Sequence, residues 1–360
     1  MTKTSVVDRV LVGLLVFVPL ALLLHALHVN PVAVFFLSCV ALVPLAAWMG
    51  TATEHMAAHV GEGPGALLNF TLGNLAEIIL AVFLLQQSQF EVVKASIAGA
   101  VMNNLLLLLG LSMLFGGRRR EKQTFNPTAA SIGSTMLTVA CAALILPAIF
   151  HALVAGHAEQ MQIEDLSDEI AVVLLVAYFC SLHFSLRTHK HLYMGKADEE
   201  GEEEAEQPWS VRGCIIVLVL CALGVTVVSE ILASSVEVVT NMLGWSKIFV
   251  GVVVLSTAGA ASEHATAIRM AIADRMDLAV GIGIGSSIQI ALFMAPTLVL
   301  VSRVMGKPMD LVFNMPEVAC VALAVVITGQ VANDGESNWM EGVQLICVYV
   351  IMALVFFHLP

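Results

Sequence analysis

The stretch FTLGNLAEIILAVFLL, residues 70–85, places one carboxylate, Glu77, inside an otherwise apolar run. About twenty apolar residues cross a bilayer as a helix. An ionised carboxylate at the centre of such a helix costs about 2.5–3.5 kcal/mol on insertion scales, so acids within membrane segments mark functional sites by default. Glu77 is therefore the first candidate functional residue of the chain.

The composition of the chain is that of a polytopic membrane protein. Of its 360 residues 59% are hydrophobic and 12% are charged, and its mean hydropathy of +0.91 lies outside the range of soluble domains. The seven cysteines form no CxxC pair and are interpreted as small buried residues. EHMAAH at 54–59 lacks the H-E-x-x-H order of zinc proteases, and GIGIGS at 281–286 is not a dinucleotide fingerprint. We therefore expect no enzyme, no cofactor and no nucleic-acid partner.

Hydropathy predicts an all-α membrane fold with about eleven transmembrane helices. The N-terminal run resembles a signal peptide but has no clear cleavage site, so it is interpreted as an uncleaved first helix. The expected segments are 7–27, 31–53, 65–86, 91–114, 128–150, 168–188, 211–232, 246–271, 277–302, 315–333 and 339–358.

The distribution of Lys and Arg predicts the orientation of these segments. With the N-terminus inside the cell, the inside connections hold twelve of the sixteen cations, and the outside ones hold four. The C-terminus is then outside. The run DEEGEEEAE at 198–206, with seven acids, lies on the cytoplasmic side and is interpreted as a solvated linker.

Two halves of the chain repeat the same motifs. A shift of 186 residues places GNLAE at 73–77 on GAASE at 259–263, and GAVMN at 99–103 on GSSIQ at 285–289. We expect residues 1–30 to form the first helix, 31–188 the first α-repeat (spans two to six), 189–210 the acidic linker and 211–360 the second α-repeat (spans seven to eleven). Five helices is an odd number, so the second repeat enters the membrane from the opposite side, as in secondary transporters.

The shift pairs Glu77 with Glu263, which predicts one shared site for two carboxylates. The neighbouring residues are small or oxygen-bearing, and glycine lets a span break and expose carbonyls. Carboxylate, carbonyl and amide oxygens are the ligands of a hard cation such as Ca²⁺. The candidate cation-site residues are Glu77, Glu263, Asn74, Asn104, Ser286 and Gln289. Asn103 and Ser287 are equally compatible with helix-to-helix bonding.

Protons and a divalent cation compete for such a pair. Burial favours the neutral form of a carboxyl group, whereas a bound cation favours the charged form. If only loaded states reorient, this competition produces antiport. The candidate proton-coupling residues are Glu77, Glu263, His264, Glu54 and Glu230.

Together GNLAEII, GAASEHATAI and GSSIQIALFMAP resemble the calcium/cation–proton antiporter family, a branch of the cation/calcium exchanger superfamily. The resemblance implies that Glu77 and Glu263 bind the cation and exchange protons, and that Asn74, Asn104, Ser286 and Gln289 line a central cavity. Sodium-coupled relatives place a proline before the acid. Ala76 and Ser262 stand there in this chain, which favours protons as the counter-ion.

The chain departs from the family pattern at Ala260, where a second asparagine is usual. The interpretation is therefore an antiporter that exports Ca²⁺ or a related divalent cation in exchange for H⁺ across a prokaryotic inner membrane. A monovalent cation/proton antiporter and a cation channel remain alternatives. The expected partners are Ca²⁺, protons and the lipid bilayer, and the sequence leaves open whether the chain forms homo-oligomers.

Overall fold

The computed structural model describes residues 6–60, 65, 68–69, 71–154, 160–189 and 209–359. The acidic run at 198–206 lies outside the described residues. The bounds of the helices in the first half are α1 Val6–Leu14, α2 Phe17–Ala26, α3 Pro31–Val60, α5 Leu75–Gln86, α6 Phe90–Met102, α7 Leu109–Gly117, α8 Pro127–Val154 and α9 Gln160–His183. Those in the second half are α10 Val211–Leu243, α11 Lys247–Phe249, α12 Ser256–Gly259, α13 Ala261–Ile272, α14 Met276–Gln289, α15 Ala295–Val304, α16 Met315–Val331 and α17 Trp339–His358.

Four π-helical segments and two short strands complete the described structure. The π-helical segments are Asn103–Leu108, Phe184–Thr188, Val250–Leu255 and Ile290–Met294. The strands β1 (Gln123–Thr124) and β2 (Glu336–Ser337) pair antiparallel. The all-helical prediction did not include them, because each strand has only two residues and forms only where two distant connections meet.

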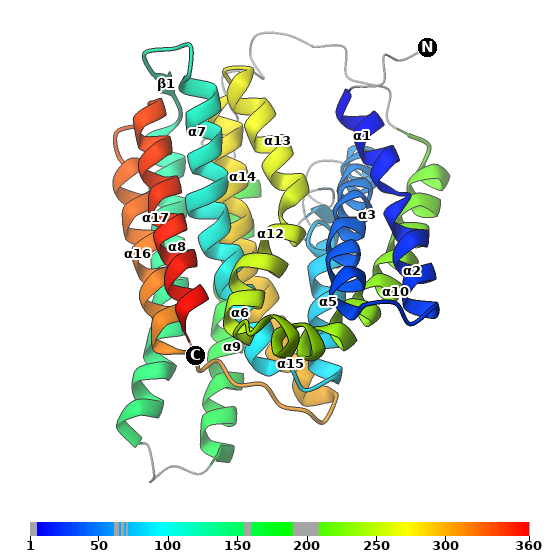
Figure 1. Cartoon of the computed structure of the whole chain (residues 1–360). Coiled ribbons are helices and arrows are strands. Elements are labelled where there is room, and N and C mark those ends of the chain that lie inside the picture. The colour runs from blue at the N-terminus through cyan, green and yellow to red at the C-terminus, as the bar shows by residue number, and fades with distance from the viewer. Residues whose placement is uncertain are drawn as a thin grey trace.

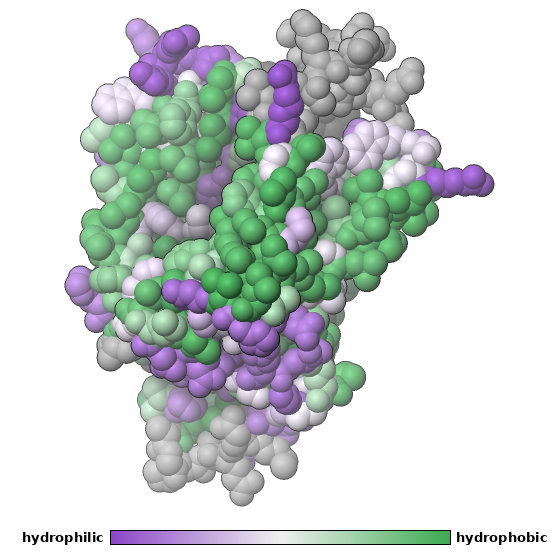
Figure 2. Space-filling view, turned by 45° about the vertical axis from the view of Figure 1, so that its right-hand side comes forward, coloured by the Kyte–Doolittle hydropathy of each residue, from purple (hydrophilic) through white to green (hydrophobic). Residues whose placement is uncertain are grey.

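Eight of the described helices are long and apolar enough to cross a membrane, or nine when the bent pair 247–259 and 261–272 is counted as one span. Two shorter apolar helices, α5 and α16, coincide with the expected segments 65–86 and 315–333. The α5 helix is shorter than the expected segment 65–86 because the chain breaks at Gly73 and Asn74, beside the glycine that the sequence indicated as a point where the span could break. Most of the middle of the surface in Figure 2 is hydrophobic, and hydrophilic residues gather toward its two ends.

The helices form two groups in Figure 1. One group contains α1, α2, α3 and α10, of which α3 and α10 pack along each other. The other contains α7, α8, α14, α16 and α17, with α12 and α13 on the side that faces the first group. Both α3 and α10 extend beyond the expected segments, to Val60 and Leu243, because apolar runs mark only the part of a helix within the bilayer.

One end of the molecule, here called the β1 end, carries β1, β2 and the turn between α13 and α14 (Figure 1). Gln123 donates from Nε2 to the Ala271 carbonyl and to Asp274 Oδ1, both at 2.8 Å. Lys122 pairs with Glu336 at 2.6 Å, and this hydrogen bond and the carboxylate charge raise the pKa of Lys122. The connection between α7 and α8 is thereby joined to both neighbouring connections.

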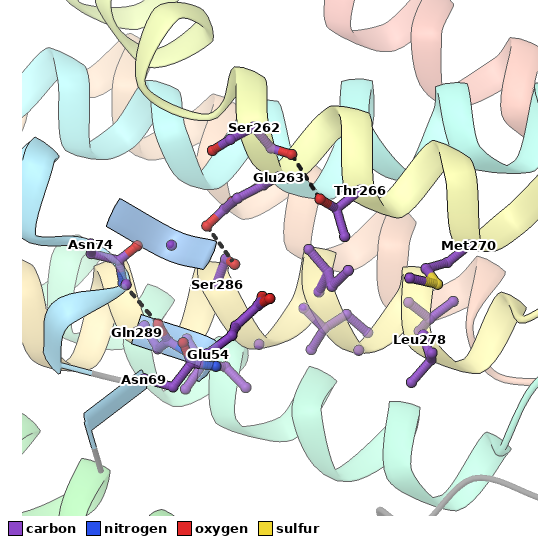
Figure 3. A pocket seen from close by; sticks show the side chains of 18 of the residues that line it. Glu54, Asn69, Asn74, Ser262, Glu263, Thr266, Met270, Leu278, Ser286 and Gln289 are labelled. Atoms are coloured by element: carbon purple, nitrogen blue, oxygen red, sulfur yellow. Dashed lines mark hydrogen bonds between the residues drawn. The ribbon is translucent and has the colours of Figure 1, made fainter. Parts of the chain in front are cut away.

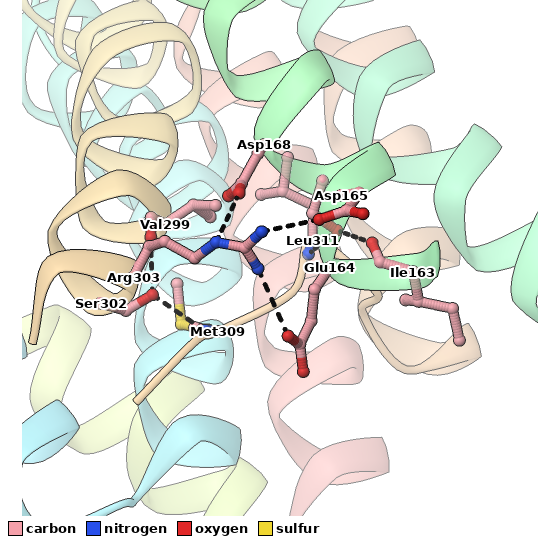
Figure 4. A network of polar contacts seen from close by, with 10 residues as sticks. Ile163, Glu164, Asp165, Asp168, Val299, Ser302, Arg303, Met309 and Leu311 are labelled. Atoms are coloured by element: carbon pink, nitrogen blue, oxygen red, sulfur yellow. Dashed lines mark hydrogen bonds and ion pairs between the residues drawn. The ribbon is translucent and has the colours of Figure 1, made fainter. Parts of the chain in front are cut away.

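The opposite end, here called the α15 end, is joined by ion pairs. Arg303 contacts three acids at the start of α9, with distances of 3.4 Å to Glu164, 2.6 Å to Asp165 and 3.1 Å to Asp168 (Figure 4). Lys94 of α6 pairs with Asp310 at 2.5 Å. These contacts hold the end of α15 against α9, and the connection between α15 and α16 against α6.

Candidate functional site

Glu77 lies in the first turn of α5, directly after a break in the chain. The backbone turns at Gly73 and Asn74, and a Cβ at Gly73 would lie 2.5 Å from the Asn69 carbonyl oxygen. Only glycine fits this close approach. The third residue of α5 is Glu77. The positive end of the helix macrodipole therefore faces the carboxylate and stabilises its charged form.

Glu263 has the same position in the second half. The chain bends by 57° between α12 and α13, with Ala260 at the bend, and Glu263 is the third residue of α13. A Cβ at Gly259 would lie 3.1 Å from both Cγ and Oε1 of Glu77. The Glu77 side chain thus packs against the break that precedes Glu263, and the structure brings the two predicted acids to one site.

Polar partners hold the site from helices α14 and η1, the π-helical segment Asn103–Leu108. Ser286 donates to Glu263 Oε1 at 3.0 Å, and Asn104 donates from Nδ2 to Glu263 Oε2 at 3.2 Å. Asn74 donates from Nδ2 to Gln289 Oε1 at 2.8 Å, which links the first break to the second half (Figure 3). All six predicted cation-site residues therefore lie in or beside one polar cluster.

π-helical segments lie beside the site in both halves of the chain. Asn103 and Asn104 open the π-helical segment that follows α6, and Gln289 precedes the one that follows α14. Asn103 donates from Nδ2 to the Ser256 carbonyl at 3.3 Å, while Asn104 reaches Glu263. A π-turn widens the helix by one residue and is common at functional sites. The sequence alone left Asn103 undecided between site and packing, and the structure places it on the backbone of the second break.

A cavity of about 1270 Å³ runs from the two acids to the β1 end. Glu54 reaches into it from α3, and Asn74, Ser286 and Gln289 line it near the acids (Figure 3). Near the β1 end its walls include Asn126 and Asp277. The acids are therefore accessible from one end of the molecule.

Toward the α15 end the site is closed. A void of about 20 Å³ lies behind Glu77, lined by residues that include Ser96, Ala100 and Leu255. This volume is large enough for one water molecule. Beyond it α6 packs closely on the π-helical segment Val250–Leu255, since a Cβ at Gly251 would lie 2.5 Å from the Ala95 Cβ.

Two predicted proton-coupling residues lie away from the cavity. His264 is buried, does not line the cavity, and donates from Nδ1 to the Ala260 carbonyl at 2.7 Å. This bond holds the bend before Glu263. Glu230 is exposed on α10 and does not line the cavity. Their proton-coupling roles stay predictions, whereas Glu54 does line the cavity.

Sequence reasoning missed other residues that line the cavity. Asn69 lies before the first break, and Thr266 and Met270 follow Glu263 on α13 (Figure 3). The spacing of Glu263, Thr266 and Met270 at three and four residues marks one helix face, so helical periodicity could have identified them. Asn69, Gly73 and Glu77 also follow one another at four-residue intervals, so the same periodicity could have identified Asn69.

The donor set suits a hard cation that is bound only transiently. Among the residues that the structure describes, no group of three or more His, Cys, Asp and Glu side chains forms a metal cluster. Two carboxylates, with serine and amide oxygens beside them, are among the oxygen ligands that Ca²⁺ takes. The negative charge of the two carboxylates can be balanced either by a bound cation or by protons.

Comparison with known proteins places the chain in a family. The model of the sodium/calcium exchanger protein family matches residues 30–187 and 214–358. The Ca²⁺/H⁺ antiporter of Synechocystis sp. is 42% identical over 99% of both chains. The Ca²⁺/H⁺ antiporter ChaA of Bacillus subtilis is 38% identical over 95% of this chain and 97% of its own.

A solved structure agrees with this assignment. The structure of native YfkE superimposes with a TM-score of 0.84 at 35% identity, covering 98% of this chain and 99% of that one. The motifs on which the resemblance rested are those that meet at the site. The chain therefore belongs to the calcium/cation–proton antiporter family of the cation/calcium exchanger superfamily.

Proposed function

We propose that the chain is a secondary antiporter that exports Ca²⁺ from the cytoplasm in exchange for H⁺. One observation carries the proposal: Glu77 and Glu263 each occupy the first turn of a short helix after a chain break, and both face the same cavity. Relatives that are named Ca²⁺/H⁺ antiporters support it at 38–42% identity over nearly the whole chain. These relatives are transporters and not enzymes.

The mechanism follows from competition at the two carboxylates. A cation that enters the cavity binds to both carboxylates and displaces their protons. After reorientation, protons from the other side neutralise the acids and release the cation. Neutral or cation-loaded acids can be enclosed at low cost, whereas two bare carboxylates cannot. The empty, doubly charged site is therefore the state that does not reorient, and transport is coupled.

The sidedness of the cavity belongs to the proposal. The cations Arg118, Arg119, Arg120 and Lys122 lie in the connection at the β1 end, which the positive-inside rule assigns to the cytoplasm. The cavity then opens inward, the C-terminus is outside, and the structure is an inward-facing state. We also propose eleven spans arranged as a first helix and two inverted five-helix repeats in a prokaryotic inner membrane. The two separate matches of the family model support this division.

Two alternatives are less well supported. A monovalent cation/proton antiporter is compatible with the loss of an amide at Ala260, which is buried at the bend. A channel needs a path open at both ends, whereas this cavity closes behind Glu77. Among the remaining predicted residues, Glu54 lines the entry and is proposed to guide cations and protons to the site.

Everted vesicles energised by a pH gradient test the function. The antiporter predicts Ca²⁺ uptake that an uncoupler abolishes, and at least a hundred-fold slower uptake for Glu77→Gln or Glu263→Gln, because each removes a charge that both ions need. The matched control is Glu237→Gln, which removes an exposed glutamate of α10 that does not line the cavity. Uptake of Na⁺ or K⁺ alone would support the monovalent exchanger. Ca²⁺ flux that ignores the pH gradient would support a channel.

A further inference from the structure

The two helices that carry the site acids end in the same way. Both α5 and α13 have 12 residues. At the end of α5, Ser88 donates to the Leu85 carbonyl and Gln89 to the Leu84 carbonyl, both at 2.9 Å. At the end of α13, Asp274 donates to the Ala271 carbonyl at 3.1 Å and Arg275 to the Met270 carbonyl at 2.9 Å. Each pair of bonds is a Schellman motif, which satisfies two of the terminal carbonyls.

Each motif turns through a residue with an unusual backbone. Ser88 has φ 58° and Asp274 has φ 65°, a region that glycine adopts readily and other residues avoid. These positions are 186 residues apart, the same shift that relates Glu77 to Glu263. Both turns therefore keep a side chain where glycine would be the usual choice. In each case that side chain contacts a cation.

The cation at each helix end comes from the other half of the chain. Lys307, between α15 and α16, donates from Nζ to the Gln86 carbonyl and to Ser88 Oγ at 3.1 Å. Arg120, between α7 and α8, donates from Nη2 to the Ile272 carbonyl at 3.1 Å and pairs through Nε with Asp274 Oδ1 at 3.3 Å. Gln86 and Ile272 are the last residues of α5 and α13, so the bonded carbonyl is the same in both.

These contacts complement the helices that they cap. The carboxyl end of a helix carries partial negative charge, and a cation there stabilises the helix. The guanidinium of Arg120 also pairs with the carboxylate of Asp274, whereas the ammonium of Lys307 donates to the neutral hydroxyl of Ser88. The two caps lie at opposite ends of the molecule, Arg120 at the β1 end and Lys307 at the α15 end. Each half of the chain thus holds the acid-bearing helix of the other half.

We propose that Arg120 and Lys307 are positioning residues of the cation site: each fixes the axial position of one acid-bearing helix, Arg120 that of Glu263 and Lys307 that of Glu77. A 12-residue helix that begins at a break has no continuous helix before it to set its position. The cap at its far end supplies that restraint, and the third residue then faces its partner carboxylate. The identity of the ion in this proposal rests on the proposed function, whereas the geometry of the two caps does not depend on it.

The test compares charge-removing and conservative variants in proteoliposomes with a pH gradient. For Arg120→Gln and Lys307→Gln we expect the half-saturating Ca²⁺ concentration to rise about three- to ten-fold while the maximal rate stays within about two-fold. Arg120→Lys and Lys307→Arg should restore most of the affinity. Loss of positive charge by itself would attract Ca²⁺ and change the affinity in the opposite direction.

Two matched controls lie close to the caps, Lys122 in the same connection as Arg120 and Arg303 in the last turn of α15. Lys122→Gln removes a neighbouring cation that pairs with Glu336 and not with α13, and Arg303→Gln removes one that pairs with α9 and not with α5. Both should leave the half-saturating concentration unchanged. Binding is measured separately as the rise in Tm on adding Ca²⁺, which should require more Ca²⁺ in Arg120→Gln and Lys307→Gln only.

The outcomes separate the positioning role from stability and from the choice of ion. An unchanged half-saturating concentration in both charge-removing variants, or a lower Tm and maximal rate with unchanged affinity, would overturn the positioning role. If Arg120→Gln does not fold, Lys307→Gln at the other end carries the test. If the wild-type protein exchanges Na⁺ or K⁺ instead of Ca²⁺, the proposed function fails. The positioning role is then tested by the half-saturating concentration of that ion in the same variants. A wild-type protein that exchanges none of these ions overturns both.

Discussion

At the scale of single residues, the contacts of Glu263 define how the site is prepared for a cation. Ser286 and Asn104 each donate a hydrogen bond to one of its two oxygens. Hydrogen bonds to a charged group are stronger than those between neutral groups. They orient the carboxylate before an ion arrives, and they reduce the cost of its charge in a membrane interior.

Removal of the Ser286 hydroxyl tests this orientation. Ser286→Ala leaves one oxygen of Glu263 without its donor, and we expect the half-saturating Ca²⁺ concentration to rise about ten-fold, because a hydrogen bond to a charged group contributes about 1.5–3 kcal/mol. The measurement is the Ca²⁺ dependence of proton-driven uptake.

Ser287→Ala is the matched control for this substitution. Its hydroxyl donates to the Gly283 carbonyl within the same helix, at 2.8 Å, and not to Glu263. Equal losses in the two variants would show that the Ser286 hydroxyl acts through helix packing and not through the carboxylate.

At the scale of elements, the breaks before α5 and α13 determine where the acids lie. A continuous span would place Glu77 near mid-helix, with its neighbours' carbonyls bonded within the helix. The break instead places each acid in the first turn of a helix, next to its N-terminus. Gly73 makes the first break, because its backbone approaches the Asn69 carbonyl.

Gly73→Ala should therefore damage the site by moving the backbone. The added Cβ would meet the Asn69 carbonyl oxygen at 2.5 Å, and overpacking of this kind costs about 1–3 kcal/mol. We expect a lower Tm and at least a ten-fold loss of Ca²⁺ uptake. Gly13→Ala is the control, since a Cβ at Gly13 of α1 meets nothing within 4 Å and Gly13 does not line the cavity. Wild-type uptake by Gly73→Ala would contradict the role of this break.

At the scale of the whole molecule, the one-sided cavity implies a second state. The acids are open to the β1 end and closed toward the α15 end by the packing of α6 on the π-helical segment Val250–Leu255. Transport requires this packing to open while the cavity closes. The small void behind Glu77 lies where the outward path would begin.

Thiol labelling in a cysteine-free background can report both states. Met270→Cys lines the cavity, so an impermeant maleimide should label it from the cytoplasmic face. Ser96→Cys lines the closed void and should be labelled only from the external face, and about ten-fold faster during turnover with Ca²⁺. Val304→Cys, where Val304 is 89% exposed at the end of α15, is the control for external access. Labelling of Met270→Cys from the external face alone would reverse the proposed orientation.

The amino-acid sequence by itself determined the membrane class, the apolar segments and the two acids at matching positions. These follow from composition and from local patterns, which indicate whether each segment lies in lipid or in water. Only the tertiary structure decided that Ser286 and Asn104 meet Glu263, that Asn74 meets Gln289, and that His264 and Glu230 lie away from the cavity. Asn74 and Gln289 are 215 residues apart. Which distant side chains meet, and which end of the cavity closes, depends on how whole helices pack, and no local pattern encodes that packing.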